Sequence, residues 1–132
     1  MNLLLDTHVL LWWLGEGRGL SEAQADALNR AEARGEVLGL SAITLWEIAK
    51  LIERGRIRLH VAVDDLLLNL ETHRRLQILP LSARVALEST RLGSRFHADP
   101  ADQLIVATAR VHGLRLLTAD QRIRDSGVVS IV

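Results

Sequence analysis

An α/β fold with a central parallel sheet and helices on both faces, a three-layer αβα arrangement, is the fold class that this sequence predicts. Short apolar runs alternate along the chain with longer amphipathic segments, which is the pattern of repeated strand–helix–strand units. The 132 residues, 48% of them hydrophobic, suit one domain with one core. We find no repeat, low-complexity segment or linker, so residues 1–132 are expected to form a single domain.

The first half of the chain predicts two strands, each followed by a helix, with a further helix between the two pairs. Capping residues and glycines mark most of the boundaries. In order, we expect a strand at 2–5, a helix at 7–14, a helix capped by Ser21 and ended at Gly35, a strand at 37–40, and a helix at 41–54.

In the second half of the chain, the pattern of apolar runs and amphipathic segments is less regular up to about residue 99 and becomes clear again after it. Pro80 cannot donate to a central ladder and therefore confines its segment to a sheet edge. In order, we expect an extended segment at 57–61, a helix at 66–72 capped by Asp64 or Asp65, an edge segment at 79–81, a helix from Ser82 to about Leu92, a helix at 100–112 stopped by Gly113, and strands at 114–118 and 128–132.

Composition excludes several classes of function. Lys+Arg and Asp+Glu both number 16, so the bulk charge does not indicate a nucleic-acid binder, and any positive surface must be local. The absence of cysteine excludes disulfides, thiolate metal sites and cysteine nucleophiles. The apolar N-terminal stretch carries Asp6 and His8 and lacks a basic leader, and no apolar run approaches the roughly 20 residues that span a bilayer. We therefore expect a cytoplasmic protein with no membrane partner.

Four acidic residues stand where strands give way to helices: Asp6, Glu47, Asp102 and Asp120. In a parallel sheet, strand ends and the starts of the following helices face one edge, so these carboxylates can converge. Like charges in one crevice repel unless a cation lies among them. Oxygen ligands without thiolates favour Mg²⁺ or Mn²⁺, ions that activate water and neutralise charge on phosphates. The chemistry is therefore phosphodiester or phosphomonoester hydrolysis.

Four blocks carry these acids in order: Leu4-Leu5-Asp6-Thr7-His8-Val9-Leu10-Leu11-Trp12, Ser41-Ala42-Ile43-Thr44-Leu45-Trp46-Glu47-Ile48, Asp99-Pro100-Ala101-Asp102-Gln103-Leu104-Ile105-Val106-Ala107-Thr108-Ala109, and Leu117-Thr118-Ala119-Asp120. The ordered set, spanning residues 2 to about 125, resembles PIN-domain proteins and in particular the VapC toxins of bacterial toxin–antitoxin pairs. The resemblance implies a Mg²⁺-dependent endoribonuclease that uses Asp6, Glu47, Asp102 and Asp120, a VapB-type antitoxin partner, and a homodimer. Many relatives carry arginine where this chain has Gln103, so their substrate preference does not carry over.

Each acid also has an ordinary structural interpretation. Asp6 and Asp120 could cap the helices that follow them. Glu47 could close a capping box with Thr44. Asp99 before Pro100 has the pattern of an N-cap with proline at the first helical position, which places Asp102 at the third. We assign Asp99 to capping and the other four acids to the metal.

Other residues near these blocks have two interpretations each. His8 and His97 flank the expected site and could transfer protons, although such histidines more often orient a neighbour or are solvated. The three tryptophans, Trp12, Trp13 and Trp46, could stack on bases, but tryptophans on such helices more often contact the core or a partner. Because Trp12 and Trp13 are adjacent, they are not expected to face one core together, which predicts that one of them lies on a partner surface. A positive rim for RNA could come from Arg54, Arg56, Arg58, Arg91 and Arg95.

Two rival functions remain open on the residues alone. A phosphomonoesterase or a receiver-type phosphoacceptor also uses an acidic Mg²⁺ pocket, but a receiver needs paired acids near its first strand and a late lysine, whereas the one lysine here is Lys50. A non-catalytic PIN-like module that binds RNA or protein is expected to have lost an acid. Metal-dependent cleavage of RNA distinguishes these possibilities.

Overall fold

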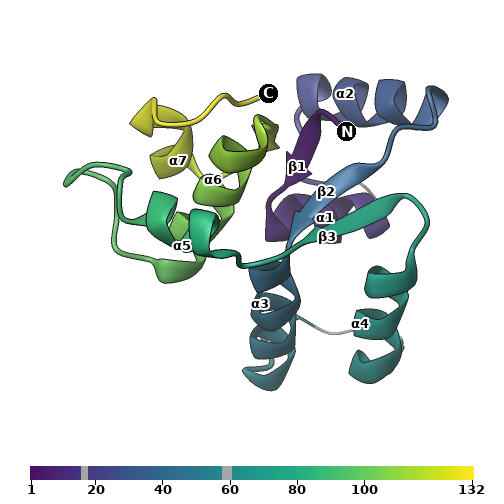
Figure 1. Cartoon of the computed structure of the whole chain (residues 1–132). Coiled ribbons are helices and arrows are strands. Elements are labelled where there is room, and N and C mark those ends of the chain that lie inside the picture. The colour runs from purple at the N-terminus through teal and green to yellow at the C-terminus, as the bar shows by residue number, and fades with distance from the viewer. Residues whose placement is uncertain (16–17, 58–60) are drawn as a thin grey trace.

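The protein folds around a four-stranded parallel sheet with the strand order β3-β2-β1-β4 (Figure 1). The computed structural model describes residues 1–15, 18–57 and 61–132. Its elements in chain order are β1 (Leu3–Leu5), α1 (Thr7–Leu14), α2 (Glu22–Ala33), β2 (Leu38–Ser41), α3 (Ala42–Glu53), α4 (Val63–Thr72), β3 (Leu76–Leu79), α5 (Ala83–Ser89), α6 (Pro100–His112), β4 (Arg115–Leu117) and α7 (Gln121–Ser126).

Helices cover both faces of the sheet, which confirms the three-layer αβα prediction. Successive side chains of a strand point to opposite faces. Leu3 and Leu5 accordingly pack with α1 and α2 in one buried cluster, whereas Leu4 packs with α6 in another. Figure 1 shows α5, α6 and α7 on one side of the strands and α1 and α2 on the other. Among the described residues, no helix combines the length and apolarity needed to cross a membrane.

Most of the helix boundaries follow the local signals in the sequence. Ser21 and Gln24 form a reciprocal capping box at the start of α2. Asp99 accepts the first amides of α6 with Pro100 at its first position, and Gly113 ends that helix with φ of 64°, a left-handed conformation that costs glycine little. These predictions are confirmed because a capping bond depends only on residues within one turn.

Elements without a strong local signal differ from the prediction. The expected cap of α4 by Asp64 or Asp65 is wrong: α4 begins after Ala62 without a side-chain cap, and both acids lie in its first turn, where they face the positive end of the helix dipole. The strand expected at 79–81 begins and ends earlier, at Leu76–Leu79, although it does lie at the sheet edge, and Pro80 follows it.

The C-terminal end and the middle of the chain also require correction. In place of a strand at 128–132, the structure has one parallel bridge between Leu116 and Ile131. The helix expected to reach about Leu92 ends at Ser89, where the Thr90 amide turns back to the carbonyls of the last turn. Most of the extended segment expected at 57–61 lies outside the described residues, because 58–60 are among those not described.

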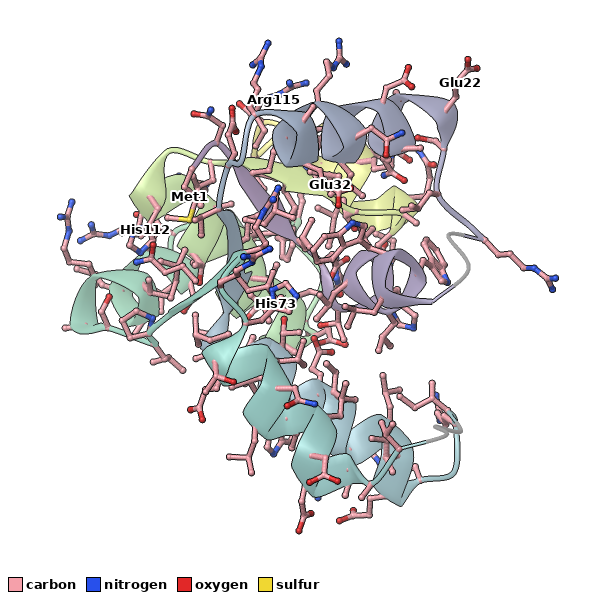
Figure 2. All side chains as sticks on the ribbon, turned by 90° about the vertical axis from the view of Figure 1, so that its right-hand side faces the viewer. Met1, Glu22, Glu32, His73, His112 and Arg115 are labelled. Atoms are coloured by element: carbon pink, nitrogen blue, oxygen red, sulfur yellow. The ribbon has the colours of Figure 1, made fainter. Side chains whose placement is uncertain are left out.

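Trp12 and Trp13 both pack, partly buried, against the same cluster, so the expectation that they cannot face one core is wrong, and a partner contact of either residue stays a prediction. Neighbouring segments cover α1 on two sides. Gly19, with φ of 94°, lies so close to Trp12 that a Cβ atom there would stand 2.6 Å from the indole ring. His73, which Figure 2 places between α4 and α1, makes an edge contact with Trp13. The exposed tryptophan is Trp46, with 52% of its surface accessible.

Candidate active site

Asp6 lies at the carboxyl end of β1, between that strand and β4. The strand order changes direction here, because β2 and β4 flank β1 on opposite sides, and ligands of open α/β sheets bind at such a point. Asp6 is only 7% exposed. Its Oδ2 accepts a hydrogen bond of 2.6 Å from the Thr118 hydroxyl and its Oδ1 accepts one of 2.8 Å from the Thr7 amide. The helix-capping role and a role in the site therefore coexist.

Glu47 lies in the second turn of α3, so its predicted capping box with Thr44 is wrong. Ser41 caps the helix instead, accepting from the Ile43 amide, and α3 begins at Ala42. The Glu47 carboxylate turns toward α1, where the Thr7 hydroxyl donates to Oε1 at 2.7 Å. Thr7 thus links the second acid to the chain segment that carries the first.

Asp102 enters the site from the first turn of α6. The Asp99 side chain accepts from the Ala101 and Asp102 amides, which confirms its capping role and leaves the Asp102 carboxylate available to the site. Asp102 Oδ2 lies 2.6 Å from Nε2 of His97. The Gln103 amide donates to the His97 carbonyl at 3.1 Å, so the residue that replaces a common arginine holds the loop that carries this histidine.

Asp120 caps α7, as its ordinary interpretation predicts, by accepting from the Arg122 amide at 2.9 Å. The guanidinium of Arg122 folds back over the same carboxylate. Its Nη2 lies 2.9 Å from Asp120 Oδ2 and 3.7 Å from Asp102 Oδ2. An exposed arginine therefore lies at the mouth of the acidic cluster and bridges two of its members.

The structure brings the predicted acids to one edge of the sheet and adds a histidine to them. Among the described residues, His97, Asp102 and Asp120 each offer one potential ligand atom within 4.8 Å of the others. Asp6 is electrostatically coupled to Asp120 and to Asp102, and Glu47 to Asp6 and Asp102. Of the four predicted acids, Asp102 and Asp120 thus belong to a group close enough to share an ion, whereas Asp6 and Glu47 are not part of that group.

Burial and mutual repulsion shape the protonation of these acids. Loss of solvent raises the pKa of Asp6, against the hydrogen bonds from Thr118 and Thr7 that lower it. Burial raises the pKa of Glu47 to about 7, with the charges of Asp6 and Asp102 acting in the same direction. Burial likewise raises the pKa of Asp102.

The pKa of Asp120 is shifted in the opposite direction. The hydrogen bond from Arg122 holds the pKa of Asp120 below its usual value. This carboxylate is therefore charged under all ordinary conditions, while the deeper acids resist ionisation unless positive charge is supplied.

The donor set fits a hard divalent cation. Carboxylate oxygens predominate, and Asp6 and Asp102 are both buried, where ionised carboxylates need a positive counter-charge. Mg²⁺ prefers such oxygen ligands, and the imidazole of His97 is acceptable to Mn²⁺. Among the described residues, His97, Asp102 and Asp120 are close enough to share such an ion, and Asp6 and Glu47 stay predicted ligands.

Sequence reasoning did not identify the residues that orient the acids. Thr7 and Thr118 supply the hydroxyl donors to Glu47 and Asp6, and Arg122 supplies the counter-charge. The only available signal was position, since Thr7 directly follows the first acid and Thr118 precedes the fourth by two residues. His8 is exposed and influences Asp6 only through its charge.

The predicted arginine rim is divided between different surfaces. Arg54 and Arg56 line a groove that also contains Glu47, whereas Arg91 lines a separate cavity of about 650 Å³ at the far end of α6. That cavity contains none of the four acids. Arg95 is exposed, and Arg58 lies outside the described residues. Of the predicted rim, Arg54 and Arg56 are therefore the arginines that share a groove with a site acid in the part of the chain that the structure describes.

Comparison with known proteins agrees with this geometry. The family model for the PIN domain matches residues 3–128, and the chain belongs to that family. It is 41% identical over 124 residues to Ribonuclease VapC22 of Mycobacterium tuberculosis, a match that covers 94% of this chain and 91% of the relative.

Solved structures share the fold. The structure of VapBC2 from Rickettsia felis bound to a DNA fragment from its promoter superposes with a TM-score of 0.73 at 16% identity, covering 100% of this chain and 98% of the other. FitAcB from Neisseria gonorrhoeae gives a TM-score of 0.64 at 26% identity, covering 98% and 95% of the two chains.

Proposed function

We propose that this protein is a metal-dependent endoribonuclease, the toxin of a toxin–antitoxin pair, and that residues 1–132 act as one nuclease domain. The observation that carries the proposal is the convergence of Asp102, Asp120 and His97 within 4.8 Å at the edge where Asp6 is buried. The 41% identity to a protein named as a ribonuclease supports RNA as the substrate.

The proposed cofactor is Mg²⁺, with Mn²⁺ as an alternative. When bound, such an ion supplies the charge that activates water and neutralises the phosphate in an in-line displacement. The carboxylates of Asp6, Asp102 and Asp120 would hold it, and the 2.6 Å hydrogen bond from Thr118 orients the Asp6 side chain. No side-chain nucleophile is required.

Glu47 and His97 have different parts in this scheme. Thr7 holds one oxygen of Glu47, so the carboxylate faces the cluster in a fixed orientation and can take a proton from water. The contact with His97 orients Asp102, and Gln103 in turn holds the backbone of His97. Arg122 compensates the acids when no metal is bound and must move aside when one binds.

A small VapB-type antitoxin is the proposed partner, and the proposed oligomer is a homodimer in the cytoplasm. Solved structures that share the fold include VapBC and FitAB bound to DNA, which supports a partner of that type. Exposed Leu68, Leu81 and Leu87 offer apolar area for such contacts. Light scattering on the isolated protein tests the dimer, and toxicity on expression that a co-expressed partner relieves tests the pair.

The decisive experiment is RNA cleavage by the purified protein with Mg²⁺, with Mn²⁺, and with EDTA. We expect cleavage of single-stranded RNA with either ion and none with chelator. The Asp6→Asn variant, prepared identically, excludes a contaminating ribonuclease and should be inactive. Cleavage that persists in excess EDTA, or in the variant, would contradict the proposed mechanism.

A further inference from the structure

A groove of about 410 Å³ runs beside the acidic cluster, between α3 and the start of α6. Glu47 and Asp99 are among its lining residues, whereas His97, Asp102 and Asp120 are not, so the groove meets the predicted site at Glu47. The other lining residues used here are Trp46 and Lys50 on α3, Arg54 at the end of that helix, and Arg56 just beyond it. The spacing of 46, 50 and 54 places these side chains on successive turns of one helix face.

Charge changes sign along this groove. The acids lie where the metal is proposed to bind, and the basic residues lie farther along α3. With a rise of about 1.5 Å per residue, Arg54 stands roughly 11 Å from Glu47 along the helix axis. In the part of the chain that the structure describes, neither Arg54 nor Arg56 takes part in an ion pair, whereas Lys50 contacts Glu53. Two cations in a chain of zero net charge are thus available beside the site.

Trp46 directly precedes Glu47 on α3, so it lies beside this acid in the groove, and Arg54 and Arg56 follow about two turns later. Its side chain lines the groove and is 52% exposed, which is a large apolar area to leave in contact with water. A flat aromatic ring at that position is a platform on which a nucleobase can stack, whatever the base.

We propose that this groove binds the single-stranded RNA next to the scissile phosphate, with one base stacked on Trp46 and neighbouring phosphates paired with Arg54 and Arg56. The inference rests on the proposed ribonuclease function. Single-stranded RNA presents unstacked bases and phosphates together, which matches both features of the groove, whereas a duplex hides its base faces. An apolar protein helix would match Trp46 but leave the two arginines without partners.

The test is the anisotropy of fluorescein-labelled oligo(U) and oligo(A) RNAs of about 12 nucleotides, titrated with full-length protein carrying Asp6→Asn to prevent cleavage. We expect Trp46→Ala to weaken binding about tenfold at every salt concentration, and Trp46→Phe to restore most of the affinity. Arg54→Gln and Arg56→Gln should each make the slope of log K against log salt about 0.7 less steep, as expected for one lost phosphate contact on a single strand.

Matched controls are Leu14→Ala, an exposed apolar residue at the end of α1, and Arg30→Gln, an exposed arginine on α2; neither should change binding. Wild-type affinity in Trp46→Ala with unchanged salt slopes in the arginine variants would overturn the inference. The inference would also be overturned if Trp46→Ala binds RNA like the parent protein and loses only its ability to form a dimer or to bind a protein partner. Cleavage of RNA by the active protein, measured in parallel, shows whether the groove alone or the nuclease proposal has failed.

Discussion

The hydroxyl of Thr7 donates a hydrogen bond of 2.7 Å to Oε1 of Glu47, joining the first residue of α1 to the second turn of α3. Thr7 is fully buried at 1% exposure, so no water can replace it as the donor. The bond lowers the pKa of Glu47 against the larger effect of burial. Orientation and protonation of this acid thus depend on a residue 40 positions away.

Thr7→Val keeps the shape of the side chain but removes the donor. We expect the rate of RNA cleavage to fall at least tenfold, and the free energy of unfolding at pH 8 to fall by about 1–2 kcal/mol in urea denaturation. Thr7→Ser keeps a hydroxyl donor and should retain most of the cleavage rate and most of the stability. The control is Thr90→Val, which removes a hydroxyl at the end of α5. Full activity in Thr7→Val would show that the bond has no part in function.

The raised pKa of Glu47 predicts an unusual dependence of stability on pH without metal. The folded protein holds a proton on Glu47 up to about pH 7, whereas an unfolded chain releases it near the ordinary value of 4.5. Between these pH values the folded state binds more protons, so the free energy of unfolding falls as pH rises. Melting temperatures in EDTA at several pH values from 5 to 8 measure this effect.

Glu47→Gln should flatten that dependence and melt higher than wild type at pH 8, because the variant carries no charge there. Some slope should remain, since the pKa values of Asp6 and Asp102 are also raised. Glu71→Gln, at an exposed position on α4, controls for the loss of any one acid. A wild-type protein that gains stability between pH 5 and 8 in EDTA would contradict the prediction.

Substitutions of Asp99 and Asp102 should differ in effect: one should lower the free energy of unfolding and the other should abolish cleavage. Asp99→Ala removes a side chain that caps two amides of α6 and should lower the free energy of unfolding by about 0.5–2 kcal/mol while leaving cleavage largely intact. Asp102→Asn is nearly isosteric and should abolish cleavage and reduce the rise in melting temperature that Mn²⁺ produces. If Asp99→Ala abolishes cleavage and Asp102→Asn keeps it, then Asp99 is the metal ligand and Asp102 is not.

Arg122 should compete with the metal, because its guanidinium bridges Asp120 and Asp102. Arg122→Gln is expected to lower the melting temperature in EDTA and to tighten Mn²⁺ binding severalfold in isothermal titration. Arg30→Gln removes an exposed arginine on α2 and serves as the control. Unchanged or weaker Mn²⁺ binding in Arg122→Gln would mean that the arginine does not oppose the ion.

Local sequence signals were sufficient for much of the fold. The short apolar runs of the strands, the caps at Ser21 and Asp99, and the stop at Gly113 are each visible within one element. Parallel strands align their carboxyl ends by geometry, so Asp6, Asp102 and Asp120 were expected at one edge before any contact was known. The sequence by itself therefore determined the fold class and the edge of the sheet at which these acids lie, and their role as metal ligands stays a prediction.

Only the tertiary structure decided how those acids are held. The Thr118 hydroxyl meets Asp6 across 112 residues because β4 pairs with β1, and His97 meets Asp102 because a loop returns to the start of α6. Trp12 and Trp13 share one core because distant segments cover α1 from two sides. Such contacts depend on strand register, helix packing and side-chain rotamers, which are set by the whole fold and leave no pattern in neighbouring residues.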